Sequence, residues 1–298
     1  MSAPATDAPV DRIGIVGGSG LRNLVQLQDA TELAVATPFA PRPVPLTAGT
    51  LHGQPVVFLQ RHGAGHTIPP HEIDARANIA ALAHVGCRQV LSVSAVGSLR
   101  EDVPPGTFVV VDQFVDRTIR RPKSFFGTGL VAHVPFAEPT CGRLRAALGD
   151  VLAAEGAPHR PDGTYVVMEG PQFSTRAESE MHRALGATVV GMTAMPEAKL
   201  AREAQLCYAL VAIPTDYDCW HDDHEAVTAD VVSATMAELA ATVARVVAAA
   251  ASAVAGGAAG CPDGCQRALD TAIMTSKEAR SPEMLERLEF LVPGIGSL

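Results

Sequence analysis

The sequence predicts an α/β fold in which a mostly parallel or mixed sheet carries helices on both faces. Short β-branched runs alternate with segments of helical pattern from residue 13 to about residue 250. No long linker divides the chain before the flexible stretch AGGAAGCPDG at 255–264. We therefore expect a flexible N-terminus at 1–11, one domain at 12–254, and a linker with a helical C-terminal extension at 255–298 that packs on the same domain.

Local signals place the elements in order. Runs rich in Val and Ile, bounded by turn residues, predict buried strands at 13–16, 56–59, 90–96, 107–112, 164–168, 188–191 and 207–213. Two predicted helices end at glycine, a third has proline in its first turn, and a fourth begins at a threonine N-cap. These run from 73 to 85, from 175 to 185, from Thr193 or Ala194 with Pro196 in the first turn, and from Thr228 to about Ala250.

Composition excludes several classes of partner. The chain has 298 residues, of which 47% are apolar, and its net charge is −9. We expect no binding to nucleic acid or to a membrane, because no broad basic face is available. The N-terminus has no signal-type segment, and the alanine-rich stretch at 243–255 is too weak to span a bilayer. The protein is therefore expected to be cytoplasmic, with any anionic ligand held at a local site.

The six cysteines point to a reduced protein. Four of them occur singly, several within apolar runs, and we expect these to be buried thiols: Cys87, Cys141, Cys207 and Cys219. Cys261 and Cys265 are separated by only three residues, which permits either a local disulfide or two flexible thiols. No metal site is expected.

A strand enters the glycine-rich turn GIVGGSGL at 14–21, which suits phosphate binding. Glycines let the backbone approach an anion, and the Ser19 hydroxyl can donate to it. Asn23 stands where a dinucleotide-binding fingerprint needs glycine, Leu21 stands where a hydrolase elbow needs glycine, and no Gly-Lys-Ser/Thr follows. A plain tight turn is the alternative.

The segment QRHGAGHTIPPHEI at 60–73 follows a predicted strand. Arg61 is a bidentate donor suited to phosphate. A metal site built from His62, His66 and His71 is the alternative, but no carboxylate or cysteine pair completes a ligand pattern. We favour a strand-end loop that presents Arg61 and His62 to an anion.

Two further strand ends carry polar groups. Ser94 and Ala95 lead into a turn at Gly97, and Met192 and Thr193 enter a helix whose positive end suits an anion. For the first segment, the alternative is an ordinary surface turn.

Phe173 lies in the loop before the helix at 175–185, and is either a platform for a flat base or a core residue. Asp216 and Asp218 point to one side if the strand continues through them, and paired carboxyls can have their pKa values pushed apart. The alternative there is a solvated acidic helix entry, although the segment 221–224, His-Asp-Asp-His, has a metal-like composition.

Taken together, these segments resemble the methylthioadenosine phosphorylases, a branch of the trimeric purine nucleoside phosphorylase family. The resemblance rests on IGIVGGSGL, RHGAGHTIPP, ARANIAAL, GSLREDVPPG, DQFVDRT, EGPQFSTRAES, MTAMPEAKLAREA and TDYDCW, which occur in the family's order over most of residues 13–228. It implies a single α/β domain with a mixed, distorted β-sheet barrel flanked by helices, and a homotrimer. It also implies a reaction that uses inorganic phosphate as substrate and needs no metal or organic cofactor.

The resemblance also implies roles for particular residues. Phosphate would be bound by Ser19, Arg61, His62, Ser94, Ala95 and Thr193. Met192 would lie along the ribose, Phe173 near the base, and Asp216 and Asp218 against N7 and the 6-amino group, with Asp216 as the catalytic acid. The 5′ substituent would meet Ala229 and Val232, and His133 and Leu291 of a neighbouring subunit. Two positions depart from the family: Ser94 replaces threonine and keeps the hydroxyl, and Ala229 replaces a larger residue.

The expected reaction is phosphorolysis of 5′-methylthioadenosine, or a related 5′-modified 5′-deoxyadenosine, to adenine and 5-methylthioribose 1-phosphate. A broader purine nucleoside phosphorylase acting on inosine, guanosine or adenosine is an alternative, but Ser174 and Asp216 favour a 6-amino purine. A hydrolytic nucleosidase and a non-catalytic nucleoside-binding protein are the remaining alternatives.

Overall fold

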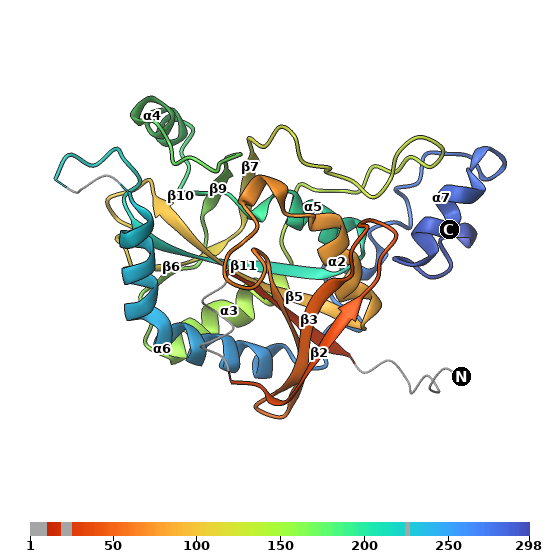
Figure 1. The fold of residues 1–298 in the computed structure, drawn as a ribbon, viewed down its shortest axis with the longest axis horizontal. Coiled ribbons are helices and arrows are strands. Elements are labelled where there is room, and N and C mark those ends of the chain that lie inside the picture. The colour runs from red at the N-terminus through yellow and green to blue at the C-terminus, as the bar shows by residue number, and fades with distance from the viewer. Residues whose placement is uncertain (1–10, 19–25, 224–226) are drawn as a thin grey trace.

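One mixed sheet lies at the centre of the part of the chain that the structure describes, residues 11–18, 26–223 and 227–298 of a computed structural model (Figure 1). Ser19, a predicted phosphate ligand, lies outside the described residues. The strands are β1 (Arg12–Gly17), β2 (Gln28–Val35), β3 (Val44–Leu51), β4 (Gln54–Gln60), β5 (Cys87–Ser98), β6 (Phe108–Val111), β7 (Gln113–Asp116), β8 (His159–Arg160), β9 (Thr164–Val167), β10 (Val189–Gly191) and β11 (Cys207–Asp216).

The longest strand, β5, organises the sheet. One path of hydrogen-bonded neighbours runs β2-β3-β4-β1-β5-β10-β9-β7, while β11 pairs with β5 and β6, and β6 pairs with β8. Strands β4, β1, β5 and β11 are parallel, whereas β10 is antiparallel to β5 and β6 is antiparallel to β11. Because β5 has β1, β10 and β11 as partners, the sheet branches there, and β11 ends beside β5.

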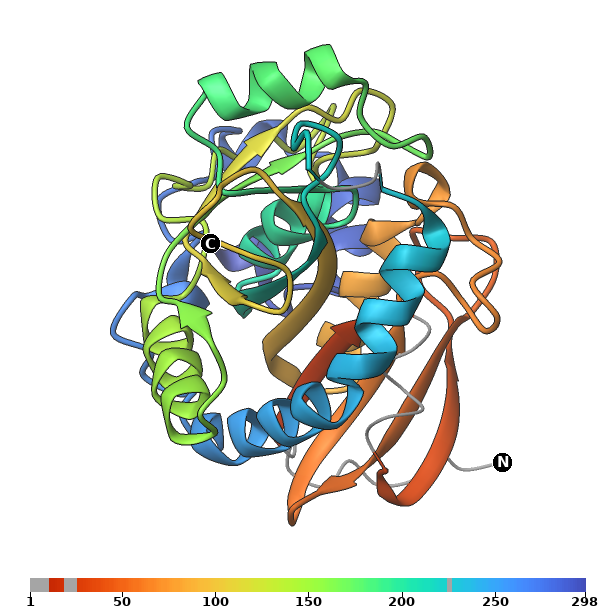
Figure 2. The ribbon, with the colours of Figure 1, turned by 90° about the vertical axis from the view of Figure 1, so that its left-hand side faces the viewer.

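Helices cover both faces of this sheet. The helices are α2 (Ala75–His84), α3 (Gly142–Ala154), α4 (Arg176–Ala184), α5 (Ala194–Glu203), α6 (Ala229–Val254) and α7 (Pro282–Glu289). Ile79 of α2 and Leu200 of α5 belong to one buried cluster, and Leu148 of α3 and Val247 of α6 belong to another. Figure 2 shows α3 and α6 side by side on their face. The predicted α/β class, with a mixed sheet flanked by helices, is confirmed.

The local capping signals produce the expected helix ends. Thr228 accepts the N–H of Val231 at the start of α6, as predicted. Thr175 and Glu178 form a reciprocal capping box on α4. Gly86 and Gly186 adopt φ values of 89° and 76° after α2 and α4, in the left-handed region that favours glycine. Each predicted strand also coincides with an observed one.

The predicted start of α5 at Thr193 or Ala194 is confirmed, since the helix spans Ala194–Glu203 with Thr193 as its N-cap residue. The helix is kinked at Met195, which has φ −114° and ψ 136°. The cause is steric, since the ring of a proline disfavours helical backbone in the residue that precedes it. The sequence interpretation missed the hairpin β2–β3, much of whose first strand is exposed, and helix α3, which has no side-chain cap.

Helix α6 and the C-terminal segment complete the core. By length and composition alone α6 could cross a membrane, but core helices meet the same test, and its second half packs against α3 and β11. Residues of the C-terminal segment, including Leu269 and Leu288, are buried in the same cluster as α2 and α5. The segment beyond α6 is therefore part of the same packed body.

Candidate active site

The most deeply buried charged pair in the site joins Arg61, just after β4, to Glu197 on α5. Arg61 is 2% exposed and Glu197 5%. Arg61 Nε and Nη2 donate to the two carboxylate oxygens at 2.8 and 3.0 Å. Ser92 accepts from Arg61 Nη2 and donates to Glu197, both at 2.8 Å, and Tyr208 donates to Glu197 at 2.9 Å. The pair therefore fixes the end of β4 against β5 and α5.

Three hydroxyl groups meet next to this pair. Ser94 Oγ lies 2.9 Å from Thr193 Oγ1 and 3.2 Å from the Tyr165 hydroxyl. Thr193 begins α5 but makes no capping bond with its side chain, which turns to Ser94 instead. Gly191 is required beside them, because a Cβ there would lie 2.2 Å from the Tyr165 oxygen. Two predicted phosphate ligands, Ser94 and Thr193, are thus brought together.

His62 follows Arg61 and presents a neutral ring. Its Nδ1 lies 2.9 Å from the carbonyl oxygen of Ile68, so Nδ1 carries a proton and donates. Burial, together with the nearby Arg61 charge, lowers the pKa of His62 to about 4 despite that hydrogen bond. Its ring stacks on His66 at 4.1 Å between centroids. A neutral His62 can accept a proton at Nε2, which suits a protonated phosphate oxygen.

Asp216 ends β11 with its carboxyl group held from both sides. Thr215 Oγ1 donates to Oδ2 at 2.7 Å, and the Asp218 N–H donates to Oδ1 at 2.8 Å. Burial raises the pKa of Asp216 to about 6, with a further contribution from Asp218. Burial also raises the pKa of Asp218, whose Oδ2 has no hydrogen-bond partner within the described ranges. Gly97 leaves room for the pair, since a Cβ there would lie 3.0 Å from Asp216 Oδ1.

Arg121 is a residue that the sequence interpretation missed. It is 6% exposed, and its guanidinium donates to the carbonyl oxygens of Met192 and Glu169, both at 2.6 Å, and of Met195 at 2.8 Å. The loop that contains Phe173 is thereby tied to Met192. The same loop contacts the residue that follows the carboxyl pair, since Cys219 Sγ donates to the Ser174 carbonyl at 3.3 Å. The partners of Arg121 are backbone carbonyl groups far away in the sequence, so no sequence motif could have revealed its role.

Three of the predicted ligand-binding residues, Phe173, Met192 and Ala95, are at least partly exposed. Phe173 is 43% exposed, so it is not a core residue. Met192 is partly exposed, and its sulfur packs against the backbone of Gly170, where a Cβ would meet it at 2.5 Å. Ala95 is exposed on β5, one residue beyond Ser94.

The predicted 5′ residues fall into two groups. Ala229 and Val232 start α6, where Thr235 donates to the Thr215 carbonyl at 3.1 Å, so this end of the helix adjoins Asp216. His133 is exposed and lies away from these strand ends, with its N–H bonded to the Ala272 carbonyl. Leu291 is 3% exposed within the core of its own chain. Contributions of His133 and Leu291 from a neighbouring subunit stay predictions.

Parallel pairing of β5 and β11 sets the spacing of the site. Ser94 pairs with Ala212, and Gly97 pairs with Asp216. Three residue steps of roughly 3.3 Å separate the hydroxyl cluster from the carboxyl along the strands, about 10 Å in all. One end of this edge carries the hydroxyl cluster and His62, and the other carries a protonatable carboxyl. A sugar between an anion and a base fits that spacing. The predicted contact of Arg61 with phosphate stays a prediction, since its guanidinium donates to Glu197, Ser92 and the Val93 carbonyl.

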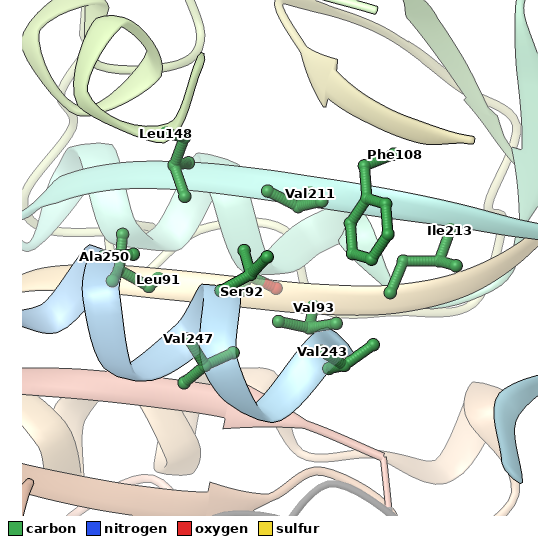
Figure 3. A pocket seen from close by; sticks show the side chains of 11 residues that line it. Leu91, Ser92, Val93, Phe108, Leu148, Val211, Ile213, Val243, Val247 and Ala250 are labelled. Atoms are coloured by element: carbon green, nitrogen blue, oxygen red, sulfur yellow. The ribbon is translucent and has the colours of Figure 1, made fainter. Parts of the chain in front are cut away.

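The internal cavity in Figure 3 is not this site. It is a volume of about 20 Å³ between β5, β11, α3 and α6, lined by Val93, Phe108, Leu148, Val247 and other apolar side chains. A space of that size holds about one water molecule. The histidines of the 60–73 loop do not form a metal-ligand cluster in the described structure, where such a cluster occurs only among cysteines.

Comparison with known proteins agrees with this geometry. The model of the phosphorylase superfamily matches residues 12–252. The chain therefore belongs to the phosphorylase superfamily. Within it, the chain is 50% identical over 277 residues to the S-methyl-5′-thioadenosine phosphorylase of Bradyrhizobium diazoefficiens, covering 93% of this chain and 95% of that protein.

Solved structures give the same grouping. A methylthioadenosine phosphorylase from an antarctic soil metagenomic library superimposes with a TM-score of 0.87 at 41% identity, covering 96% of this chain and 100% of that one. The Schistosoma mansoni methylthioadenosine phosphorylase in complex with adenine has a TM-score of 0.77 at 37% identity, covering 82% and 92%. The family resemblance inferred from the sequence is confirmed.

The Arg61–Glu197 pair makes a prediction for stability. Replacing Glu197 by Ala leaves the Arg61 charge buried and unpaired, so the free energy of unfolding should fall by about 3–5 kcal/mol. Glu197→Gln keeps one acceptor and should lose less. Urea unfolding followed by circular dichroism measures both. The matched control is Asp102→Ala, which removes exposed ion pairs to Arg100 and Arg160 and should cost less than about 1 kcal/mol. Equal losses for Glu197→Ala and Asp102→Ala would contradict the assignment.

Proposed function

We propose that this enzyme cleaves 5′-methylthioadenosine with inorganic phosphate, giving adenine and 5-methylthioribose 1-phosphate. The observation that carries the proposal is a protonatable Asp216 on β11, three residue steps along the paired strands from the hydroxyl cluster of β5 and α5. The names of the similar proteins support the same substrate. The reaction needs no metal or organic cofactor, because phosphate supplies the nucleophile and the protein supplies the acid.

Bond changes in this reaction match the two ends of the site. A phosphate oxygen attacks the anomeric carbon, and the bond from that carbon to N9 of the purine breaks. The electron pair of the broken bond moves to the purine, which becomes a better leaving group when N7 is protonated. Phosphate held by Ser94, Thr193 and His62 is aligned for attack, so the reaction draws on positioning as well as acid catalysis.

Asp216 supplies the proton and also recognises the base. The hydrogen bonds from Thr215 and the Asp218 N–H fix the plane of its carboxyl group, while a second position on each oxygen remains for a ligand. Protonated Asp216 can donate to N7, and the unpartnered Asp218 Oδ2 can accept from a 6-amino group. In a 6-oxo purine, an oxygen that only accepts hydrogen bonds replaces the 6-amino group and would face the Asp218 carboxylate oxygen, which is also an acceptor. The site therefore favours adenine.

A phosphate requirement follows from the hydroxyl cluster. Purified protein should release adenine from methylthioadenosine only when phosphate is present. Thr193→Val should raise the KM for phosphate about 10- to 100-fold, since a hydrogen bond to a charged group contributes about 1.5–3 kcal/mol. Ser252→Ala removes a hydroxyl from the far part of α6 and serves as control. Adenine release at the same rate without phosphate would identify a nucleosidase instead.

The acid role of Asp216 is tested by Asp216→Asn. The amide keeps the shape and can donate to N7, but it cannot deliver a proton. The kcat/KM for methylthioadenosine should therefore fall by roughly 10²–10⁴-fold, and activity on inosine should rise relative to it. Asp223→Asn, an exposed carboxyl in the next loop, is the control. A loss of only a few-fold with an unchanged ratio between the two purines would remove Asp216 from the mechanism.

We also infer that the enzyme is a homotrimer with sites at subunit interfaces. The family resemblance supports this, as do the exposed position of His133 and the largely exposed first half of α6. Light scattering of the purified protein should give three times the chain mass. A fully active monomer would contradict the inference, and with it the contribution of His133 from a neighbouring subunit.

A further inference from the structure

Four of the six cysteines, from three separate parts of the sequence, lie close together in the structure. Cys141 precedes the first residue of α3, Cys207 is the first residue of β11, and Cys261 and Cys265 lie in the loop after α6. Their four sulfur atoms all lie within 4.8 Å of one another. Each is buried, with exposures of 0%, 0%, 7% and 1%. Neither Cys87 nor Cys219 belongs to this cysteine cluster.

The sulfur separations match a tetrahedral metal centre. Cys141 Sγ lies 3.6 Å from Cys261 Sγ, which lies 3.8 Å from Cys265 Sγ. A zinc ion with four thiolate ligands at about 2.3 Å has sulfur–sulfur edges of about 3.8 Å. A disulfide would require about 2.05 Å, and two disulfides would split the four sulfurs into separate pairs. All six cysteines are free thiols in the structure.

The local chain geometry is also that of a metal loop. Cys261 and Cys265 are separated by Pro-Asp-Gly, within the two to four residues typical of paired zinc ligands. A hydrogen bond of 3.0 Å from the Gly264 N–H to the Cys261 carbonyl closes the turn. Gly264 has φ +66°, a conformation that favours glycine. The turn holds both sulfurs on the same side, facing the other two.

Groups around the cluster can stabilise thiolates. Gln266 Nε2 donates to Cys207 Sγ at 3.1 Å. Cys141 stands at the N-terminus of α3, where the helix dipole favours negative charge. Cys141 Sγ lies 3.3 Å from Asp263 Oδ2, which also accepts the Arg143 N–H at 3.0 Å. The hydrogen bond from Cys141 to Asp263 belongs to the thiol form of Cys141, so it is lost when Cys141 binds a metal as a thiolate, and the Arg143 N–H remains a donor to Asp263.

We propose that Cys141, Cys207, Cys261 and Cys265 bind one structural zinc ion. Four thiols release four protons as Zn²⁺ binds, and no electron transfer is involved. The four ligands complete the coordination of the metal and leave no open position, so the site is structural rather than catalytic. This proposal revises two expectations from the sequence, isolated buried thiols and the absence of a metal site, and it is independent of the reaction proposed above.

The position of the cluster defines what the metal would do. It joins the loop after α6 to the starts of α3 and β11, and the chain that follows that loop packs into the core through Leu269 and Leu288. A metal there would anchor the C-terminal segment to the sheet. Metal loss should therefore destabilise this segment first, because binding free energy to a structural site is also folding free energy.

Metal analysis of the full chain tests the proposal. Protein produced with added zinc and dialysed against a weak chelator should contain one zinc per chain by mass spectrometry. Cys207→Ser and Cys265→Ser should each lower the zinc content at least about tenfold, because a closed four-thiolate site loses a ligand. Cys87→Ser, a buried cysteine outside the cluster, should retain full zinc content.

If the variants of the cysteine ligands do not fold, measurements on the wild-type protein still test the proposed zinc site. X-ray absorption at the zinc edge should show four sulfur neighbours at about 2.3 Å. A mercurial reagent that titrates four thiols should release one zinc ion. Metal-free protein with free thiols would overturn the proposal. So would an intact mass about 2 or 4 Da low, which indicates one or two disulfides, or iron instead of zinc.

Discussion

Desolvation of charge at the ends of β4, β5 and β11 is the constraint on which the site depends. A buried charge must be paired or neutralised, because leaving it alone in a protein interior costs several kcal/mol. Arg61 is neutralised by Glu197, with Ser92 and Tyr208 completing the hydrogen bonds. This network involves β5, β11 and α5, so one interaction fixes the relative positions of the elements that carry the hydroxyl cluster.

The same constraint acts differently on the carboxyl pair. Among the described residues, no cationic side chain offsets the burial of Asp216, and His182 lowers the pKa of Asp218 without cancelling the effect of burial. The cost of burying the Asp216 carboxylate is therefore reduced by protonation rather than by an ion pair, and the pKa of Asp216 rises to about 6. The two ends of the site therefore differ, with a paired cation at one and a protonatable carboxyl at the other. The proposed phosphorolysis uses that carboxyl as an acid, whereas binding of a nucleoside alone would not require one.

Sequence reasoning succeeded where the signal is local. The strands and caps depend on runs of a few residues, and Arg61 and Asp216 stand at strand ends that α/β folds use for ligands. The predicted turn at Gly97 is wrong, because β5 continues through Ser94 and Gly97 to Ser98. Sequence reasoning failed where the partner is remote. Glu197 and Arg121 gain their roles from contacts made across the fold, and nothing near them in the chain marks those contacts. The cysteine cluster is a further example, since Cys141 and Cys207 lie in unrelated elements.

The protonation of Asp216 is the most direct test. The carboxyl carbon of Asp216 can be followed by ¹³C NMR as the pH is varied, and assigned by its absence in Asp216→Asn. A midpoint near 6, well above the ordinary value of 3.8, is the expected result, because burial without a cation favours the neutral acid. A midpoint at or below 4 would show that the carboxyl is ionised throughout the working range, and that it cannot supply the proton to the leaving purine.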